Sequence, residues 1–214
     1  MRRFFLHMGI TIKLMFVMLF ALPAQAEMIG TITNLKGDVL LQRHNSEVPA
    51  PIKIDTEIFI GDQIETLNDQ SAVEITFIDN TNIFISGERG ALIIDEYVFD
   101  PEVAEQGRAR FSLINATFRY IGGILSKTNN ADVQVELAFG SIGIRGTKFW
   151  RTMSDKQCWI YLEEGAISVF NEAGEQILVP GQGTRLTDKQ IAPENAQMWD
   201  PGRVSWIKQT VKAQ

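Results

Sequence analysis

The segment FGSIGIRGTKFW, residues 139–150, is where residue types and spacing come closest to those of a ligand site. Gly140, Gly143 and Gly146 recur every three residues, and Arg145 lies between the last two. Phosphate-binding loops combine close backbone approach with a basic side chain. A P-loop, however, has lysine directly after its last glycine and then a helix. Here the order is Gly-Thr-Lys and strand-like residues follow, so a phosphate or dinucleotide loop is disfavoured.

A structural role for this segment is the favoured interpretation. In an extended strand, alternate residues face opposite sides, so two isoleucines would share one face and Arg145 the other. Glycines inside a strand mark bends or close approaches of another backbone. Arg145 would then be a half-buried arginine that binds a carboxylate or a carbonyl, and a ligand-binding arginine is the alternative. The residues predicted to shape the sheet are Ile142, Gly143, Ile144, Arg145, Gly146 and Thr147.

Histidine and cysteine are too scarce for most metal or nucleophile chemistry. His44 is the only histidine after residue 26, and Cys158 is the only cysteine. A structural zinc site needs more ligands of these types, and one cysteine cannot form an intrachain disulfide. His44 lies in a polar, proline-containing stretch that reads as an exposed loop. Cys158 shares a strand face with Ile160 and Leu162, which predicts a small buried side chain.

Carboxylates could support only a limited enzyme class, such as a glycan hydrolase. The adjacent acids are Glu163–Glu164 and Asp95–Glu96. Neighbouring residues on a strand point to opposite faces, so neither pair forms a two-carboxylate site naturally. No acidic calcium-loop motif is present. We therefore predict no enzyme activity, no cofactor and no metal.

The N-terminus has the three parts of a cleavable signal peptide. Arg2 and Arg3 supply a positive start, residues 14–22 are apolar, and small residues stand at Ala24 and Ala26. We expect cleavage after Ala26 and export to the periplasm, without stable membrane insertion afterwards. An uncleaved anchor is the alternative, but the apolar run is short for a bilayer span.

The charge of the mature chain limits the classes of partner that it can be expected to bind. Removing residues 1–26 takes away three basic residues and no acid, which leaves 17 basic against 26 acidic residues and a formal net charge of −9. Nucleic acids and anionic membranes bind basic surfaces, so neither is an expected partner. An envelope protein or another ligand remains possible.

Period-two alternation dominates the mature sequence. In SAVEITFIDNTNIFISG, Val73, Ile75 and Phe77 face one way, residues 79–81 make a turn, and two isoleucines run back. Further short strands are predicted in GDVLLQR, ALIIDEYVF, DVQVELAF, CWIYLEEG and AISVFNEAGEQILVPG. Helix is predicted only as a brief turn near PEVAEQGRAR and in the tail RVSWIKQTVKAQ. The fold class is all-β, as a β-sandwich, a jelly-roll-like fold or a β-solenoid with a short C-terminal helical tail.

Five segments in order resemble the FecR domain family. IGIRGTKF resembles its I-G-[IV]-R-G-T-x-F hallmark, and the others are GTITNLKGDVLLQR, IFIGDQIETLNDQSAVEITFIDNTNIFIS, FRYIGGIL and LEEGAISVFNEAGEQILVPGQGTRL. The resemblance covers about residues 29–186. The chain departs from the family at Leu137 and Ala138, where Thr-Pro is common, and at Asn80, where glycine is usual.

The resemblance implies a domain of the cell envelope rather than a complete regulator. The family's named member is a transmembrane regulator of iron-uptake transcription, and this chain resembles only the periplasmic part. Its sigma-factor function is therefore not carried over. We expect a signal peptide at 1–26, a FecR-like β domain at 27–190 and a tail at 191–214. The expected function is a non-enzymatic binding, scaffolding or signalling module.

Overall fold

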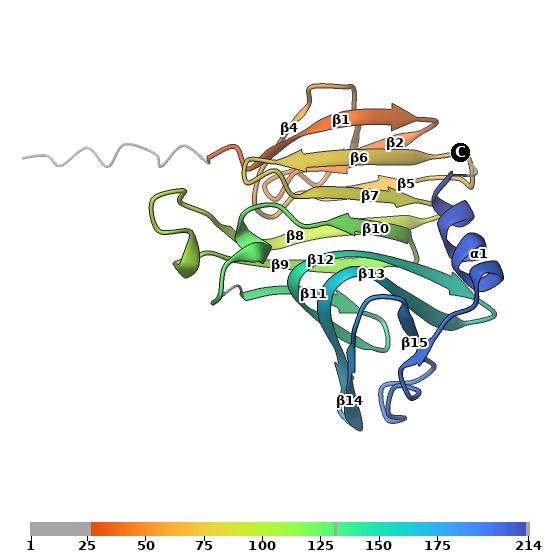
Figure 1. The fold of residues 1–214 in the computed structure, drawn as a ribbon. Coiled ribbons are helices and arrows are strands. Elements are labelled where there is room, and N and C mark those ends of the chain that lie inside the picture. The colour runs from red at the N-terminus through yellow and green to blue at the C-terminus, as the bar shows by residue number, and fades with distance from the viewer. Residues whose placement is uncertain (1–26, 131, 213–214) are drawn as a thin grey trace, which may run out of the picture.

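The computed structural model describes residues 27–130 and 132–212, so the predicted cleavage residues Ala24 and Ala26 lie outside the described residues. The described part of the chain is a single 16-stranded sheet with one α-helix (Figure 1). The strands of the first half of the chain are β1 Gly30–Lys36, β2 Val39–Gln42, β3 Ala50–Pro51, β4 Glu57–Ile58, β5 Gln63–Thr66, β6 Ala72–Phe77, β7 Asn82–Ser86 and β8 Gly90–Val98.

The remaining elements complete the sheet and cover part of it. They are the 3₁₀ turn η1 Ala104–Gln106, β9 Arg108–Ile114, β10 Thr117–Ile121, the 3₁₀ turn η2 Leu125–Lys127, β11 Asp132–Leu137, β12 Gly140–Ser154, β13 Gln157–Asn171, β14 Gly174–Leu178, β15 Gln182–Leu186, β16 Gln197–Met198 and α1 Pro201–Lys212. The all-β prediction with a short helical tail is confirmed.

The sheet curls so that its two halves face each other. One half runs β3-β2-β5-β8-β9-β11, the other runs β10-β7-β6-β1-β4, and β12 joins them. The first part of β12 pairs with β11 and the last part pairs with β10. β13 follows β12 along its whole length, then pairs with β14 in one half and β15 in the other. The hairpin β12–β13 is therefore the seam of the fold.

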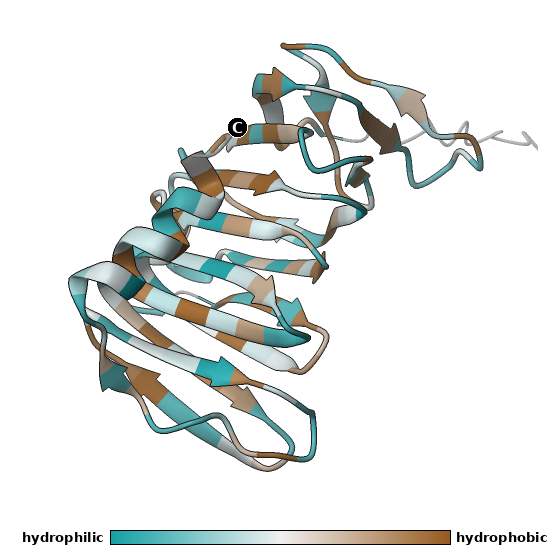
Figure 2. Ribbon diagram, turned by 90° about the vertical axis from the view of Figure 1, so that its right-hand side faces the viewer, coloured by the Kyte–Doolittle hydropathy of each residue, from teal (hydrophilic) through white to brown (hydrophobic). Residues whose placement is uncertain are grey.

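Alternating side chains fill the space between the halves. Figure 2 shows hydrophobic and hydrophilic residues alternating along the strands, as expected when one face is buried. A single cluster of buried residues includes Ile32 and Ile75 from one half and Ile64 and Phe111 from the other. This shared core fixes the two halves relative to each other. The exposed polar and charged side chains lie on the opposite, outer faces of the strands.

The helix α1 covers part of the outer face of the second half. Ile207 and Val211 pack on Trp150, Tyr161 and Trp199 in a separate apolar cluster. The helix begins after Asp200, whose Oδ1 accepts hydrogen bonds from the amides of Gly202 and Arg203 at 2.9 and 3.1 Å. Asp200 is thus an N-cap followed by proline at the first helical position, a common helix start.

Most local predictions agree with these elements, with one difference in strand length. The predicted hairpin is β6–β7, and Asn80 has φ +66° in its turn. The segment near PEVAEQGRAR contains η1, and the tail forms α1. CWIYLEEG and AISVF, however, are two parts of the 15-residue strand β13, because Gly165, the last residue of CWIYLEEG, bends the strand without ending its pairing with β12.

Candidate functional site

The bend in the seam explains two of the glycines in the β12–β13 hairpin. Gly146 has φ +59° and Gly165 has φ +83°, a region that favours glycine. A Cβ on Gly165 would collide with the carbonyl oxygen of Gly146, so the two backbones touch directly. The β12–β13 register shifts between Arg145 and Lys148 at the same place. The two glycines therefore let the hairpin pass from one half of the sheet to the other.

The other residues of the segment divide between core and surface. Ile142 and Ile144 are buried in the core. Thr147 is also buried, and its Oγ1 has no hydrogen-bond partner among the described residues. Gly143 and Arg145 lie on the outer face, where the Arg145 side chain is exposed to solvent. Within residues 142–147, Arg145 is consequently the one charged side chain, and it lies on the outside.

A groove of about 380 Å³ lies on this outer face, across β11, β12, β13 and β14. Its floor is made by small residues that are neighbours in the sheet register, since Gly143 pairs with Ser168 and Arg145 pairs with Ala166. A Cβ on Gly143 would come within 2.7 Å of the Ser168 hydroxyl oxygen, so glycine keeps the floor low. Larger residues form the rim, namely Asp132, Gln134, Glu175 and Ile177. We call this surface the Gly143 groove.

Arg145 differs in its charge pairing from the other arginines near the groove. Arg110 donates to the Asp132 carboxylate at 2.6 Å, and Arg108 forms an ion pair with Glu96. The Arg145 side chain is exposed and makes no hydrogen bond or ion pair with the described residues. The sequence-based expectation of a half-buried, paired Arg145 is therefore wrong. At this position the outward face of β12 is exposed to solvent, so the guanidinium has no carboxylate or carbonyl within reach among the described residues.

His44 is exposed, as predicted, and lies at a second surface hollow of about 910 Å³ beside Arg43, Phe59 and Asp62. Asp62 is buried, accepts a hydrogen bond from the Phe59 amide at 2.9 Å and pairs with Arg43 at 2.6 Å. Burial raises the pKa of Asp62, although the Phe59 amide and Arg43 oppose the rise. Arg43 and Asp62 already neutralise each other, whereas Arg145 at the Gly143 groove has no ion pair with the described residues, so we favour the groove as the ligand site.

Cys158 lies in the core, together with Ile160 and Leu162 on the predicted face. Arg151 is buried beside it and donates its Nε to the Cys158 sulfur at 3.2 Å. The Arg151 Nη1 donates to the Ala116 carbonyl. The sequence pattern does not predict this buried arginine. Arg151 occupies an inward position of the β12 alternation, where an apolar side chain is expected.

The acidic pairs do not form a two-carboxylate site. Glu163 lies between Lys208, at 2.7 Å, and Lys148, at 3.4 Å, while Glu164 is exposed beside the bend. Burial alone would raise the pKa of Glu163, but the hydrogen bond and charge of Lys208, together with Lys148, lower it overall. A lowered pKa suits an ion pair rather than a general acid.

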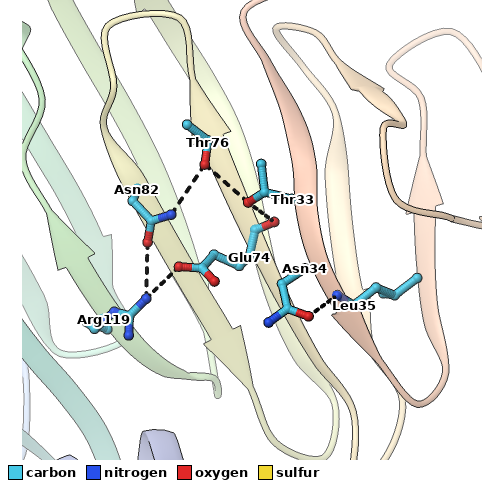
Figure 3. A network of polar contacts seen from close by, with 7 residues as sticks. All are labelled: Thr33, Asn34, Leu35, Glu74, Thr76, Asn82 and Arg119. Atoms are coloured by element: carbon cyan, nitrogen blue, oxygen red, sulfur yellow. Dashed lines mark hydrogen bonds and ion pairs between the residues drawn. The ribbon is translucent and has the colours of Figure 1, made fainter.

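A polar network on the outer face of the second half was not expected from the sequence (Figure 3). Arg119 donates to Glu74 at 2.6 Å and to Asn82 at 3.1 Å, and Asn82 donates to Thr76. The Arg119 guanidinium also lies over the Phe84 ring. The groups mostly satisfy one another. The signal for this network was the polar half of the period-two alternation, which does not reveal which residues become neighbours.

The described residues contain no cluster of histidine, cysteine or carboxylate side chains that could hold a metal ion. In the same part of the chain, no helix has the length and apolar character needed to cross a bilayer. The Gly143 groove, with a free guanidinium over a low floor, has the chemistry of a binding surface for a carboxylate or another anion.

Two solved structures share this fold. Both are candidate anti-sigma factors from Parabacteroides distasonis ATCC 8503, solved at 2.50 and 1.65 Å. The first aligns with a TM-score of 0.53 at 11% identity, covering 67% of this chain and 62% of that chain. The second aligns with a TM-score of 0.50 at 10% identity, covering 65% and 61%.

The likeness to these structures concerns the fold alone. The alignment with this chain spans less than two thirds of the length of either structure. No protein-family model matches the sequence, and no curated protein matches it.

Proposed function

We propose that this protein is a non-enzymatic binding module of the cell envelope, which signals or scaffolds by binding a protein partner at the Gly143 groove. The observation that carries the proposal is the unpaired guanidinium of Arg145 at this groove. Arginine binds carboxylates in a two-pronged geometry, so the partner segment is expected to carry an aspartate or a glutamate.

The surroundings of Arg145 support a recognition role over a structural one. An exposed charge without a partner contributes little to folding, so stability does not explain the residue. The neighbouring arginines Arg110 and Arg108 are neutralised by Asp132 and Glu96, whereas Arg145 has no ion pair with the described residues. The fold shared with two candidate anti-sigma factors is consistent with a regulatory protein that acts through a protein partner.

The proposal is tested by capturing partners from an envelope extract with the purified protein. Arg145→Gln removes the charge and keeps a polar side chain of similar length. Arg89→Gln is the matched control, because Arg89 is an exposed arginine in the β7–β8 turn, outside the groove. A partner retained by the wild type and by Arg89→Gln, but lost with Arg145→Gln at unchanged melting temperature, would support the proposal. Equal capture by all three proteins would refute the role of the groove.

We further propose that the chain is exported to the periplasm and that residues 1–26 are removed as a signal peptide. The support is the order of basic start, apolar run and small residues at Ala24 and Ala26. Mass spectrometry of the protein purified from its native cell should find Glu27 at the N-terminus. A retained Met1 would show that the segment is not removed.

A further inference from the structure

The outer strands of the sheet differ in how they are protected against pairing with another chain. Four strands end the described sheet, and three of them, β3, β4 and β16, have only two residues each. Very short strands and proline are common protections of a sheet edge, and β3 has both features. The fourth, β14, has five residues, GEQIL, with no proline, no lysine and no register shift. Among the four strands that end the described sheet, β14 is therefore the longest, and its pairing is regular.

The free backbone groups of β14 follow from its hairpin with β13. Asn171 pairs with Gly174 across a two-residue turn, so these two residues exchange both backbone hydrogen bonds. By alternation, Gln176 and Leu178 also bond to β13, whereas the N–H and C=O groups of Glu175 and Ile177 point away from it. The backbone bonds outside regular elements involve neither residue. Each copy of the chain thus presents four free groups in a row.

Exposed apolar side chains lie on this edge and beside it. Ile177 is 67% exposed and Val179 is 50% exposed. Met198, on the adjacent edge strand β16, is 67% exposed. In Figure 1, β14 lies at the lower rim of the molecule, away from β1 and β6. The edge is therefore accessible to a second chain.

We propose that β14 pairs antiparallel with β14 of a second copy and forms a two-fold dimer. In the register that places Gln176 opposite Gln176, Glu175 of each copy exchanges both backbone hydrogen bonds with Ile177 of the other. All four free groups of each copy are then satisfied, with nothing left over. The first half of the sheet continues from one copy into the other. Because the edge can satisfy all of its free groups by pairing with itself, we assign a second copy as its occupant.

The side chains agree with this register. Glu175 would lie next to Ile177 of the other copy, so the two carboxylates stay apart. A register centred on Ile177 would instead require the backbone of Val179, but its N–H already donates to the Gln182 side chain at 3.1 Å, and its C=O accepts from the Gln182 amide at 3.0 Å. Glu175 and Ile177 also stand on the rim of the Gly143 groove, but the pairing uses their backbone groups, and Arg145 takes no part in it.

The test measures the mass in solution, by sedimentation equilibrium, of the protein made from the full-length chain. The wild type should form dimers in a concentration-dependent way. Ile177→Glu should be monomeric, because it places two glutamates side by side at each end of the interface. The double variant Glu175→Lys with Ile177→Glu should dimerise again, since lysine then faces glutamate. Ile177→Pro should also be monomeric, because it removes a free N–H that β13 does not use.

Two controls keep the result interpretable. Val48→Glu changes a residue that is 75% exposed elsewhere and should leave the dimer intact. Arg145→Gln should also dimerise, which separates this proposal from the binding function of the groove. Unchanged circular dichroism would show that the variants fold. A wild type that stays monomeric, a dimer that survives Ile177→Glu or Ile177→Pro, or a double variant that stays monomeric would overturn the proposed pairing.

Discussion

Gly165 lies against Gly146 so closely that a Cβ on the first would collide with the carbonyl oxygen of the second. Gly146 itself has ordinary space around it, since the nearest atoms to a Cβ there, on Lys127 and Ser126, are 3.6 Å away. Only its positive φ is special. The close approach that the sequence suggested for Gly146 is therefore a property of Gly165, on the paired strand.

The first prediction is that Gly165→Ala destabilises more than Gly146→Ala. Gly146→Ala should cost about 1–2 kcal/mol, the penalty of a left-handed backbone for alanine. Gly165→Ala adds a collision with the backbone and should cost about 3 kcal/mol or more. Denaturant unfolding measures both. Gly146→Asn is a control that should be nearly neutral, because asparagine tolerates this conformation. Equal costs at the two positions would contradict the described contact.

Arg145→Ala is expected to leave the stability of the protein unchanged. The side chain is exposed and has no hydrogen bond or ion pair with the described residues, so its removal leaves no buried group unsatisfied. A thermal melt should shift by no more than that of Arg89→Ala, which truncates another exposed arginine. A clear loss of stability would show that Arg145 has a structural partner after all.

The ion pairs of Glu163 should make the docking of α1 sensitive to acid. The pKa of Glu163 is lowered in the folded protein, so the pairs contribute stability above its ordinary pKa of 4.5 and lose it as the pH falls through the lowered value. The contribution is at most about 1 kcal/mol for such partly exposed pairs. Tryptophan fluorescence should report the change, because Trp150, Trp199 and Trp206 surround or belong to α1.

Two glutamine variants separate this effect from general acid unfolding. Glu163→Gln should remove the acid-dependent fluorescence change and loosen the helix at neutral pH. Glu164→Gln changes the exposed neighbouring residue, whereas Lys148 and Lys208 form their ion pairs with Glu163. This variant should behave as wild type. If both variants titrate alike, Glu163 does not control the helix.

Cys158 should react with thiol reagents only when the protein unfolds. Its side chain is fully buried in the core, beside Arg151. Labelling in native buffer should therefore be slow and should follow the rate of global unfolding, whereas denatured protein should label at once. Ala173→Cys, in the exposed β13–β14 turn, is a positive control for a reactive thiol. Fast native labelling at Cys158 would contradict its burial.

The sequence predicts the strands well because one buried face produces period-two alternation. It does not predict which strands meet, and the features missed here depend on such meetings. Asp79 reads as a turn residue, yet it is buried and accepts hydrogen bonds from Tyr97 at 2.7 Å and from the Leu125 amide at 3.0 Å, both distant in sequence. Burial and the charge of Asp79 raise the pKa of Tyr97.

The candidate site shows the same limit. Strand alternation places Gly143 and Arg145 on the face opposite the two isoleucines, but whether that face is open and whether Arg145 has a partner depend on β11 and β13. Arg110 is an example of such a dependence. It forms an ion pair with Asp132 across the β9–β11 pair, which no local sequence pattern specifies. The open edge at β14 likewise follows from the order of strands in the sheet rather than from the GEQIL sequence itself.

The seam made by β12 and β13 also determines when the protein can become native. One half of the sheet ends at β10 and the other at β11, and both of these strands pair with β12, so the halves cannot be joined before β12 is available, and β12 ends at Ser154. Contacts between segments so far apart in sequence make folding slow and strongly cooperative. A chain that crosses a membrane N-terminus first would remain unfolded, and thus able to pass a narrow channel, until most of its length had been delivered. The late position of the seam in the sequence delays completion of the fold.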